Sequence, residues 1–218
     1  MSDVAAALAE VRERIAAAAR GAGRDPDAVR LVAATKTVPA ERVAEAVALG
    51  VTDIGENRAQ ELIAKAEALD ELVPTAAASW HFLGRLQRNK VRSLAARVAW
   101  WQSVDRDPLG TAIARHAPGA RVLVEVNLAG EPQKGGCAPA DAARLVDAFR
   151  QAGLRVEGLM TIPPAGDDPR PWFATPRDLA ADLDVHELSM GMTDDFEAAV
   201  AEGATMVRIG RAIFGARA

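Results

Sequence analysis

The sequence of 218 residues lacks several features that would direct it to particular classes of protein. It has a single cysteine, Cys137, so no disulfide can form within the chain and a reducing compartment is the simplest setting. No apolar stretch reaches the ~18 residues that a membrane span needs, and the first residues mix acids and arginines with alanine, unlike a secretory signal. We therefore expect a cytoplasmic protein with no membrane partner.

Tyrosine is absent, and only four of the 26 basic residues are lysines, namely Lys36, Lys65, Lys90 and Lys134. We attribute the excess of arginine to a compositional bias of the genome, and each remaining lysine therefore draws attention. The formal net charge is −4, so no global positive field recruits nucleic acid or acidic lipid. We expect no nucleic acid among the partners.

Short apolar runs alternate with amphipathic helical patterns along the chain. The expected strands span residues 29–36, 51–56, 80–84, 100–105, 121–127, 154–162, 187–190 and 206–209. The expected helices span 3–20, 39–49, 58–69, 85–97, 108–116, 140–152, 177–183 and 193–202, the last with Thr193 as N-cap, and a flexible loop is expected over 163–176. This order predicts an α/β protein, a single (β/α)8 TIM barrel with an extra N-terminal helix, in one domain over residues 1–218. A doubly wound open sheet is the alternative.

Lys36 ends the first expected strand, and a barrel of this kind places its chemistry at the carboxyl ends of the strands. The ordinary pKa of a lysine is about 10.4, which keeps the amine protonated at neutral pH. Desolvation and neighbouring cations lower that pKa and favour the nucleophilic amine. Lys36 is therefore a candidate for Schiff-base chemistry, and a lysine that extends into solvent beside a loop is the alternative.

Two turns with small residues follow the last two expected strands. Ser189 and Gly191 belong to the first turn, and Gly210 and Arg211 belong to the second. Barrels commonly bind phosphate with the backbone N–H groups of these two turns, although two ordinary turns would look the same. Arg208 lies within the last strand, where a buried charge needs a partner. That partner is either a carboxylate or the ring nitrogen of a heteroaromatic cofactor.

Several segments match, in order, those of a known family. The segments are ATKTVP (34–39), GENRAQE (55–61), WHFLGRLQRNK (80–90), VEVNLAGEPQKGG (124–136), GLMTIPP (158–164) and LSMGMTDDFEAAVAEGATMVRIGRAIFGAR (188–217). They cover nearly the whole chain, and the last block is the most specific. The chain thereby resembles the pyridoxal phosphate homeostasis proteins, which are relatives of the N-terminal barrel of alanine racemase.

The resemblance implies roles for individual residues. Lys36 would bind pyridoxal 5′-phosphate as a Schiff base, and Arg208 would face the pyridine nitrogen. Ser189, Gly210 and Arg211 would surround the phosphate, the last two through backbone N–H groups. Some relatives carry a small hydroxyl residue at the position of Arg211, so backbone or charge would have to replace that hydroxyl here.

The resemblance also implies that Asn57, His81 and Met160 line the cofactor pocket, and the chain shows no metal-binding motif. It implies a protein that carries or buffers the cofactor in vitamin B6 homeostasis. Apo forms of pyridoxal phosphate enzymes are the candidate acceptors, and we expect a monomer.

Alanine racemases use two bases, the cofactor lysine and a tyrosine on a separate β-domain. We expect no second domain after Ala218, and the chain has no tyrosine, which leaves only another residue type such as His81 as a second base. An arginine at the pyridine nitrogen also disfavours ring protonation and weakens the cofactor as an electron sink. We therefore expect no efficient racemase activity, and a weak pyridoxal phosphate-dependent racemase or a lyase is the alternative.

Two further interpretations are open. A phosphate-sugar enzyme could use Lys36 as an aldolase-type amine, since Glu56 and Glu125 also lie at strand ends. A nucleic-acid surface could form on the basic segment after the third strand, although such a segment is usually a solvated face. The residues of that segment are Arg85, Arg88, Lys90, Arg92 and Arg97.

Overall fold

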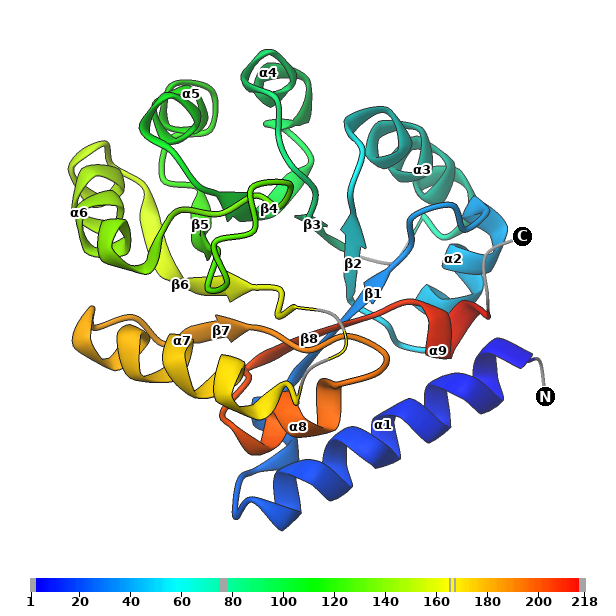
Figure 1. The fold of residues 1–218 in the computed structure, drawn as a ribbon. Helices are drawn as coiled ribbons and strands as arrows, with labels where there is room; N and C mark the ends of the chain where they lie inside the picture. The colour runs from blue at the N-terminus through cyan, green and yellow to red at the C-terminus, as the bar shows by residue number, and fades with distance from the viewer. Residues whose placement is uncertain (1–2, 75–77, 165, 167, 216–218) are drawn as a thin grey trace.

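Eight parallel strands close into a barrel in the computed structural model, which describes residues 3–74, 78–164, 166 and 168–215 (Figure 1). The strands are β1 (Arg30–Ala34), β2 (Asp53–Glu56), β3 (Ser79–Phe82), β4 (Val98–Val104), β5 (Arg121–Val126), β6 (Arg155–Thr161), β7 (Glu187–Ser189) and β8 (Met206–Ile209). Each strand pairs with the next in sequence, and β8 pairs with β1 to close the ring. The predicted TIM barrel is confirmed, and the open-sheet alternative is wrong.

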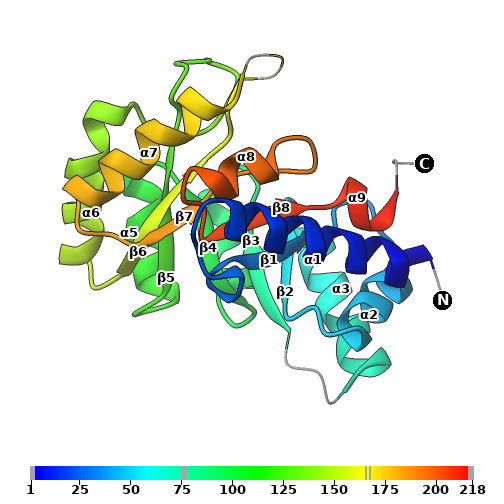
Figure 2. The same cartoon turned by 90° about the horizontal axis from the view of Figure 1, so that it is seen from below.

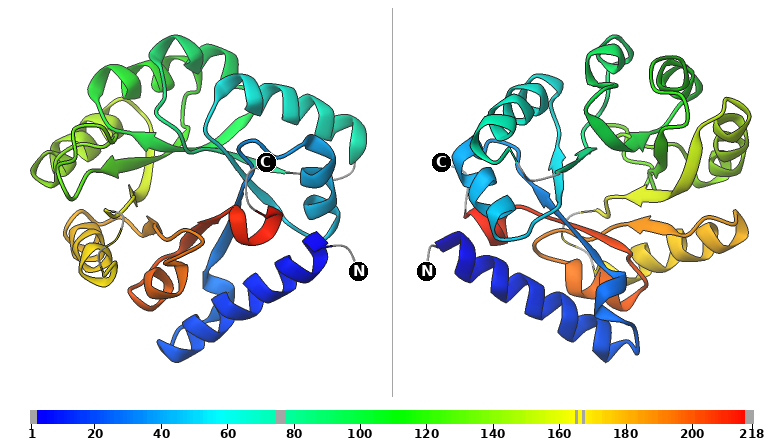
Figure 3. Two further views of the ribbon diagram at one scale, coloured as in Figure 1. Left: turned by 45° about the vertical axis from the view of Figure 1, so that its right-hand side comes forward. Right: turned by 180° about the vertical axis from the view of Figure 1, so that it is seen from behind.

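Helices surround the barrel wall, as the two views of Figure 3 show. They are α1 (Asp3–Gly21), η1 (Pro26–Ala28), α2 (Ala40–Ala48), α3 (Ala59–Leu72), η2 (Arg88–Lys90), α4 (Val91–Leu94), α5 (Asp107–His116), η3 (Pro139–Asp141), α6 (Ala142–Gln151), α7 (Arg170–Asp182), α8 (Phe196–Ala201) and α9 (Arg211–Phe214). The predicted extra helix is α1, which packs across α8 and α9 (Figure 2). Within the described ranges, no helix is long and apolar enough to cross a bilayer.

Two apolar layers hold the fold together, because successive residues of a strand point to opposite faces of the sheet. The larger layer lies between the strands and the helices. The smaller one fills the barrel interior and contains Val32, Trp100, Leu123, Met160 and Met206, each at most 3% exposed. The interior is therefore a packed core, and a ligand can reach only the ends of the barrel.

The predicted flexible loop over residues 163–176 is partly wrong, because α7 already begins at Arg170. Pro171 occupies the first turn of this helix, where its missing N–H has no bond to lose. Pro176 lies inside the helix and removes one intrahelical hydrogen bond. It belongs to a buried face with Phe173 and Ala180, and the burial of that face outweighs the unfavourable local preference of proline.

Two other helix predictions need correction. The basic helix expected over 85–97 is reduced to η2 and α4, and residues 85–87 form no helix. Gly84, directly before them, packs against the backbone of Asn57. The helix expected over 193–202 is α8, which begins at Phe196 and not at Thr193. Asp195 precedes it, and its carboxylate accepts the N–H of Met192 at 2.5 Å, which orders the turn before the helix.

Candidate functional site

Lys36 lies in the turn that follows β1, and its side chain is exposed. The N–H of Val38 donates to the carbonyl of Thr35 at 2.9 Å and closes this turn, in which Thr37 has a positive φ of 65°. Val32 faces the barrel interior, and Lys36 follows it by an even number of residues. Lys36 lies just after β1 at the carboxyl end of the barrel, where such folds place their chemistry.

A buried ion pair lies behind this turn, between the barrel wall and α3. The ammonium group of Lys65 donates to the backbone oxygen of Thr35 at 2.6 Å and also pairs with the carboxylate of Glu56. The same carboxylate accepts the hydroxyl of Thr35 at 2.8 Å. Lys65 is 8% exposed and Glu56 is fully buried. Glu56 was a candidate acid for an aldolase-type site because it ends a strand. Its carboxylate instead faces α3 and is paired with Lys65.

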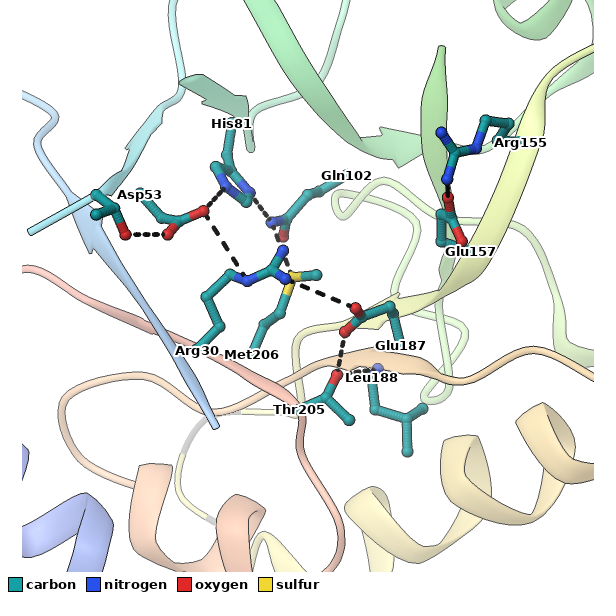
Figure 4. A network of polar contacts seen from close by, with 11 residues as sticks. Arg30, Asp53, His81, Gln102, Arg155, Glu157, Glu187, Leu188, Thr205 and Met206 are labelled. Atoms are coloured by element: carbon teal, nitrogen blue, oxygen red, sulfur yellow. Dashed lines mark hydrogen bonds and ion pairs between the residues drawn. The ribbon is translucent and has the colours of Figure 1, made fainter. Parts of the chain in front are cut away.

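A chain of hydrogen bonds crosses the barrel interior from Arg208 to Asp53. Arg208 Nη1 donates to Ser189 Oγ at 2.7 Å, and Ser189 Oγ donates to Gln102 Oε1 at 2.6 Å. Gln102 Nε2 lies 2.6 Å from His81 Nδ1, and His81 Nε2 lies 2.9 Å from Asp53 Oδ1. Figure 4 shows the part of this chain from Asp53 through His81 to Gln102.

The charges of Arg208 and Asp53, at the two ends of this hydrogen-bond chain, determine which group donates in every bond between them. The guanidinium of Arg208 can only donate, and the carboxylate of Asp53 can only accept. The amide nitrogen of Gln102 must then donate to His81, which is the neutral tautomer with its proton on Nε2. Burial lowers the pKa of His81, even though the hydrogen bond to Asp53 acts in the opposite direction.

Charged and aromatic groups close the opposite end of the barrel, where the strands begin. Arg30 lies 4.0 Å from both Asp53 and Glu187. Figure 4 shows its guanidinium between these two carboxylates. Its guanidinium lies 4.9 Å from the ring centroid of Trp100, and the ring of His81 stacks on Trp100 at 5.8 Å. Burial alone would raise the pKa of Asp53, but its hydrogen bonds to His81 and Thr52 and the charge of Arg30 hold that pKa below the ordinary value.

Arg208 lies next to the last residue of β8 and is 5% exposed. Its Nη2 donates to the backbone oxygen of Thr161 at 2.8 Å, in addition to the bond that Nη1 makes to Ser189. Burial lowers the pKa of Arg208 to about 10, against the opposing charges of Glu125 and Asp195. The side chain is therefore a fixed cation at neutral pH.

Glu125 lies next to the last residue of β5 and is 8% exposed. No residue in the described part of the chain donates a hydrogen bond to its carboxyl group, and Gly135 packs so closely that a Cβ there would lie 3.0 Å from Oε2. Burial, and then the charge of Asp105, raise the pKa of Glu125 to about 7, although Arg208 acts in the opposite direction. Glu125 therefore changes its charge near neutral pH.

The two turns expected to hold a phosphate lie against each other. Thr193 Oγ1 accepts the N–H of Ala212 at 3.4 Å, and Arg211 forms an ion pair with Asp194. Ser189, at the end of β7, points into the barrel interior. It is fully buried, and its hydroxyl is used by the chain inside the barrel. The half-buried hydroxyl at these turns belongs to Thr193.

The protein's own packing requires glycine in both turns. Gly191 has a φ of +91°, and a Cβ there would lie 2.6 Å from the Cβ of Ala199 in α8. A Cβ on Gly210 would lie 2.6 Å from the backbone oxygen of Ala34. Both distances are too short for any side chain, so these glycines bring each turn close to the neighbouring elements.

The three residues expected to line the pocket have different surroundings. Asn57 is half-buried and lines a hollow of about 180 Å³ together with Arg58. Met160 is 1% exposed, within the interior core, and pairs with Ser189 in the sheet. His81 is fully buried. Met160 and His81 therefore lie below the carboxyl end of the barrel, which forms its mouth. The hydrogen-bond chain links His81 to Arg208 near that end.

Several residues of these networks were not identified from the sequence. Lys65 falls on the apolar stripe of α3, three residues after Leu62 and four before Leu69, and this is a signal that it is buried. Gln102 is a polar residue within the apolar strand β4, and Arg208 is a charged residue within β8. Asp53 begins β2, which is fully buried. Polar residues in such positions need partners, but the sequence does not identify those partners.

A family profile described as "Alanine racemase, N-terminal domain" matches residues 7–218. The pyridoxal phosphate homeostasis protein of Pseudomonas aeruginosa is 44% identical over 227 residues, which cover 100% of this chain and 97% of that one. The protein of the same name from Aquifex aeolicus is 42% identical over 224 residues, 96% of each chain. Among solved structures, PipY of Synechococcus elongatus with pyridoxal phosphate bound has a TM-score of 0.82 and 34% identity, covering 97% of this chain and 100% of that chain.

Proposed function

Because the chain belongs to the pyridoxal phosphate homeostasis proteins, a family that shares the N-terminal domain of alanine racemase, we propose that it binds pyridoxal 5′-phosphate through a Schiff base on Lys36 and carries or buffers this cofactor in vitamin B6 homeostasis. The observation that carries the proposal is the position of Lys36, an amine at the mouth of a barrel whose interior presents a fixed cation, Arg208. The PipY structure with the cofactor bound supports it.

The donor set at the mouth fits this cofactor. Pyridoxal phosphate supplies an aldehyde that condenses with a primary amine, and Lys36 is the amine in that position. The backbone N–H groups of the turns after β7 and β8, with the hydroxyl of Thr193 and the charge of Arg211, would hold the phosphate. Ser189, which the resemblance placed at the phosphate, would instead orient Arg208, because its hydroxyl is already bonded on both sides.

We propose that turnover of amino acids is slow or absent. Arg208 can only donate, so a pyridine nitrogen beside it is disfavoured from carrying a proton, and its bonds to Ser189 and Thr161 keep it in place. The sequence contains no tyrosine to act as a second base. His81 is fully buried with both ring nitrogens bonded, so it is poorly placed to replace one. A racemase or a lyase is the alternative function.

The proposal extends to the setting of the protein. We propose that residues 1–218 act as one cofactor-binding domain, monomeric and cytoplasmic, that passes the cofactor to apo enzymes. The single cysteine supports a reducing compartment. Light scattering of the purified protein tests the monomer, and recovery of activity by an apo enzyme mixed with the loaded protein tests the transfer.

Absorption spectroscopy combined with borohydride reduction tests the central proposal. Protein saturated with pyridoxal phosphate is expected to absorb in the visible range, to lose this absorption on reduction, and to carry the reduced adduct on Lys36 in mass spectrometry. Lys36→Ala is expected to remain uncoloured. An adduct on another lysine, or an unmodified Lys36 in saturated protein, overturns the proposal. Rapid conversion of L-alanine to D-alanine that is lost in Lys36→Ala would support the racemase instead.

A further inference from the structure

Lys65 lies directly behind the turn that carries Lys36 and has no part in the function proposed so far. Its ammonium group has three acceptors, the backbone oxygen of Thr35 at 2.6 Å, the carboxylate of Glu56, and Glu61 Oε2 at 3.5 Å. It is 8% exposed, so these contacts are shielded from water. All of its bonding capacity is therefore directed to the surroundings of one turn.

Glu61 extends this contact to the other side of Lys36. Its Oε2 accepts the N–H of Thr37 at 3.2 Å. Thr37 has a φ of 65°, a conformation that is unfavourable for a β-branched residue and persists only where the surroundings maintain it. The carbonyl group before Lys36 is thus held by Lys65 directly, and the N–H group after Lys36 is held through Glu61.

We infer that Lys65 is a positioning residue, which fixes the backbone on both sides of Lys36 and thereby directs the amine of Lys36 into the barrel mouth. The inference rests on the proposed function, since it concerns the amine that would bind the cofactor.

Stability alone does not explain a charged group at this position. Lys65 occupies the apolar stripe of α3 together with Leu62 and Leu69, where an apolar side chain would avoid the cost of desolvating an ammonium group. Removal of charge from a buried pair is often neutral or stabilising when both partners are replaced. What an apolar side chain could not do is bind the carbonyl of Thr35 and the carboxylate of Glu61 at once.

The orientation of Lys36 determines how often its amine reaches an aldehyde in the mouth. A displacement of about 1 Å costs on the order of 100-fold in rate when reacting groups must be aligned. Loss of the Lys65 contacts frees the Thr35 carbonyl and weakens the grip on Thr37. We therefore expect the rate of adduct formation at Lys36 to fall roughly 10- to 100-fold.

Three variants test this role, with Lys90→Met as the matched control on a lysine outside the buried pair. Lys65→Met alone leaves the buried Glu56 unpaired, so it is combined with Glu56→Gln to remain folded. Glu61→Ala removes the acceptor of the Thr37 N–H and the more distant carboxylate partner of Lys65, and it leaves the Lys65–Glu56 pair in place. Lys65→Arg retains the charge and is expected to recover part of the rate.

Two measurements are made on each protein. The first is the hydrogen exchange of the amides at residues 36–38 in protein without cofactor, which reports the order of the turn. The second is the rate of Lys36 adduct formation with pyridoxal phosphate, trapped by borohydride at pH 6 to 9. Faster exchange, a slower rate with a changed pH profile, and partial recovery in Lys65→Arg support the inference.

The inference is overturned when the double variant and Glu61→Ala both show the same hydrogen exchange, adduct-formation rate and pH profile as the wild-type protein. This outcome is distinct from a failure of the proposed function, in which the wild-type protein itself forms no adduct at Lys36. A rate that falls equally in Lys90→Met also overturns the inference, because the loss would then be unrelated to the turn.

Discussion

Glu125 makes the stability of this protein depend on pH in a direction opposite to that of an ordinary carboxylate. Burial raises its pKa from 4.5 to about 7 in the folded chain. The folded state therefore binds a proton more tightly than the unfolded state does. The stabilising contribution is fully present below pH 4.5 and is lost as the pH rises through about 7.

The size of this change in stability follows from the difference between the pKa values of Glu125 in the folded and unfolded states. Each pH unit between the two pKa values corresponds to ~1.4 kcal/mol, so the rise from 4.5 to about 7 amounts to about 3 kcal/mol. Glu125→Gln keeps the shape of the protonated side chain and removes the titration. At pH 8 the variant is expected to be more stable than the wild-type protein by about 3 kcal/mol, with little difference near pH 4.

Urea unfolding of the cofactor-free protein between pH 4.5 and 8 measures this difference. Comparing the variant with the wild-type protein at each pH cancels the titration of all other groups. This matters because His81 and Asp53 have lowered pKa values, so their contributions to stability increase as the pH rises, opposite to that of Glu125. Glu10→Gln, on the exposed face of α1, is the matched control. Parallel stability curves for Glu125→Gln and wild type would refute the reasoning, since they would mean that the carboxyl is solvated or paired in solution.

Three further predictions concern the rest of the molecule. Asp53→Asn removes the anion that fixes the tautomer of His81, so we expect the His81 pKa to fall further in an NMR titration. The free energy of unfolding in urea should decrease by about 1–2 kcal/mol. An unchanged His81 titration contradicts the hydrogen-bond chain. Burial raises the pKa of Cys137 to about 11, from 9.0, so its reaction with a thiol reagent at pH 8 should be about 100-fold slower than that of free cysteine, and a rate within a few-fold of free cysteine contradicts it. Thr193→Val should weaken pyridoxal phosphate binding roughly 10-fold in a fluorescence titration by removing a hydroxyl donor, and unchanged affinity excludes that hydroxyl from the phosphate site.

The architecture could be predicted because its signals are local and repeat along the chain. Each strand is a short apolar run, and eight of them separated by helices have few ways to fold other than a closed barrel. The errors occurred where distant packing overrode local preference. Buried Phe173 and Pro176 hold α7 in a segment whose prolines predict a loop. Gly84 likewise packs against the backbone of Asn57 directly before residues 85–87, which form no helix.

Residue types and strand ends made Lys36 and Arg208 candidates, because an amine at the end of a strand and a charge within one are unusual wherever they occur. The partners of these groups were decided only by the three-dimensional fold. Lys65 meets the Thr35 carbonyl across 30 residues, and Ser189 meets Gln102 across 87. Closure of the barrel alone brings such residues together, since a hydrogen bond depends on distances of tenths of an ångström, which no periodicity in the chain encodes.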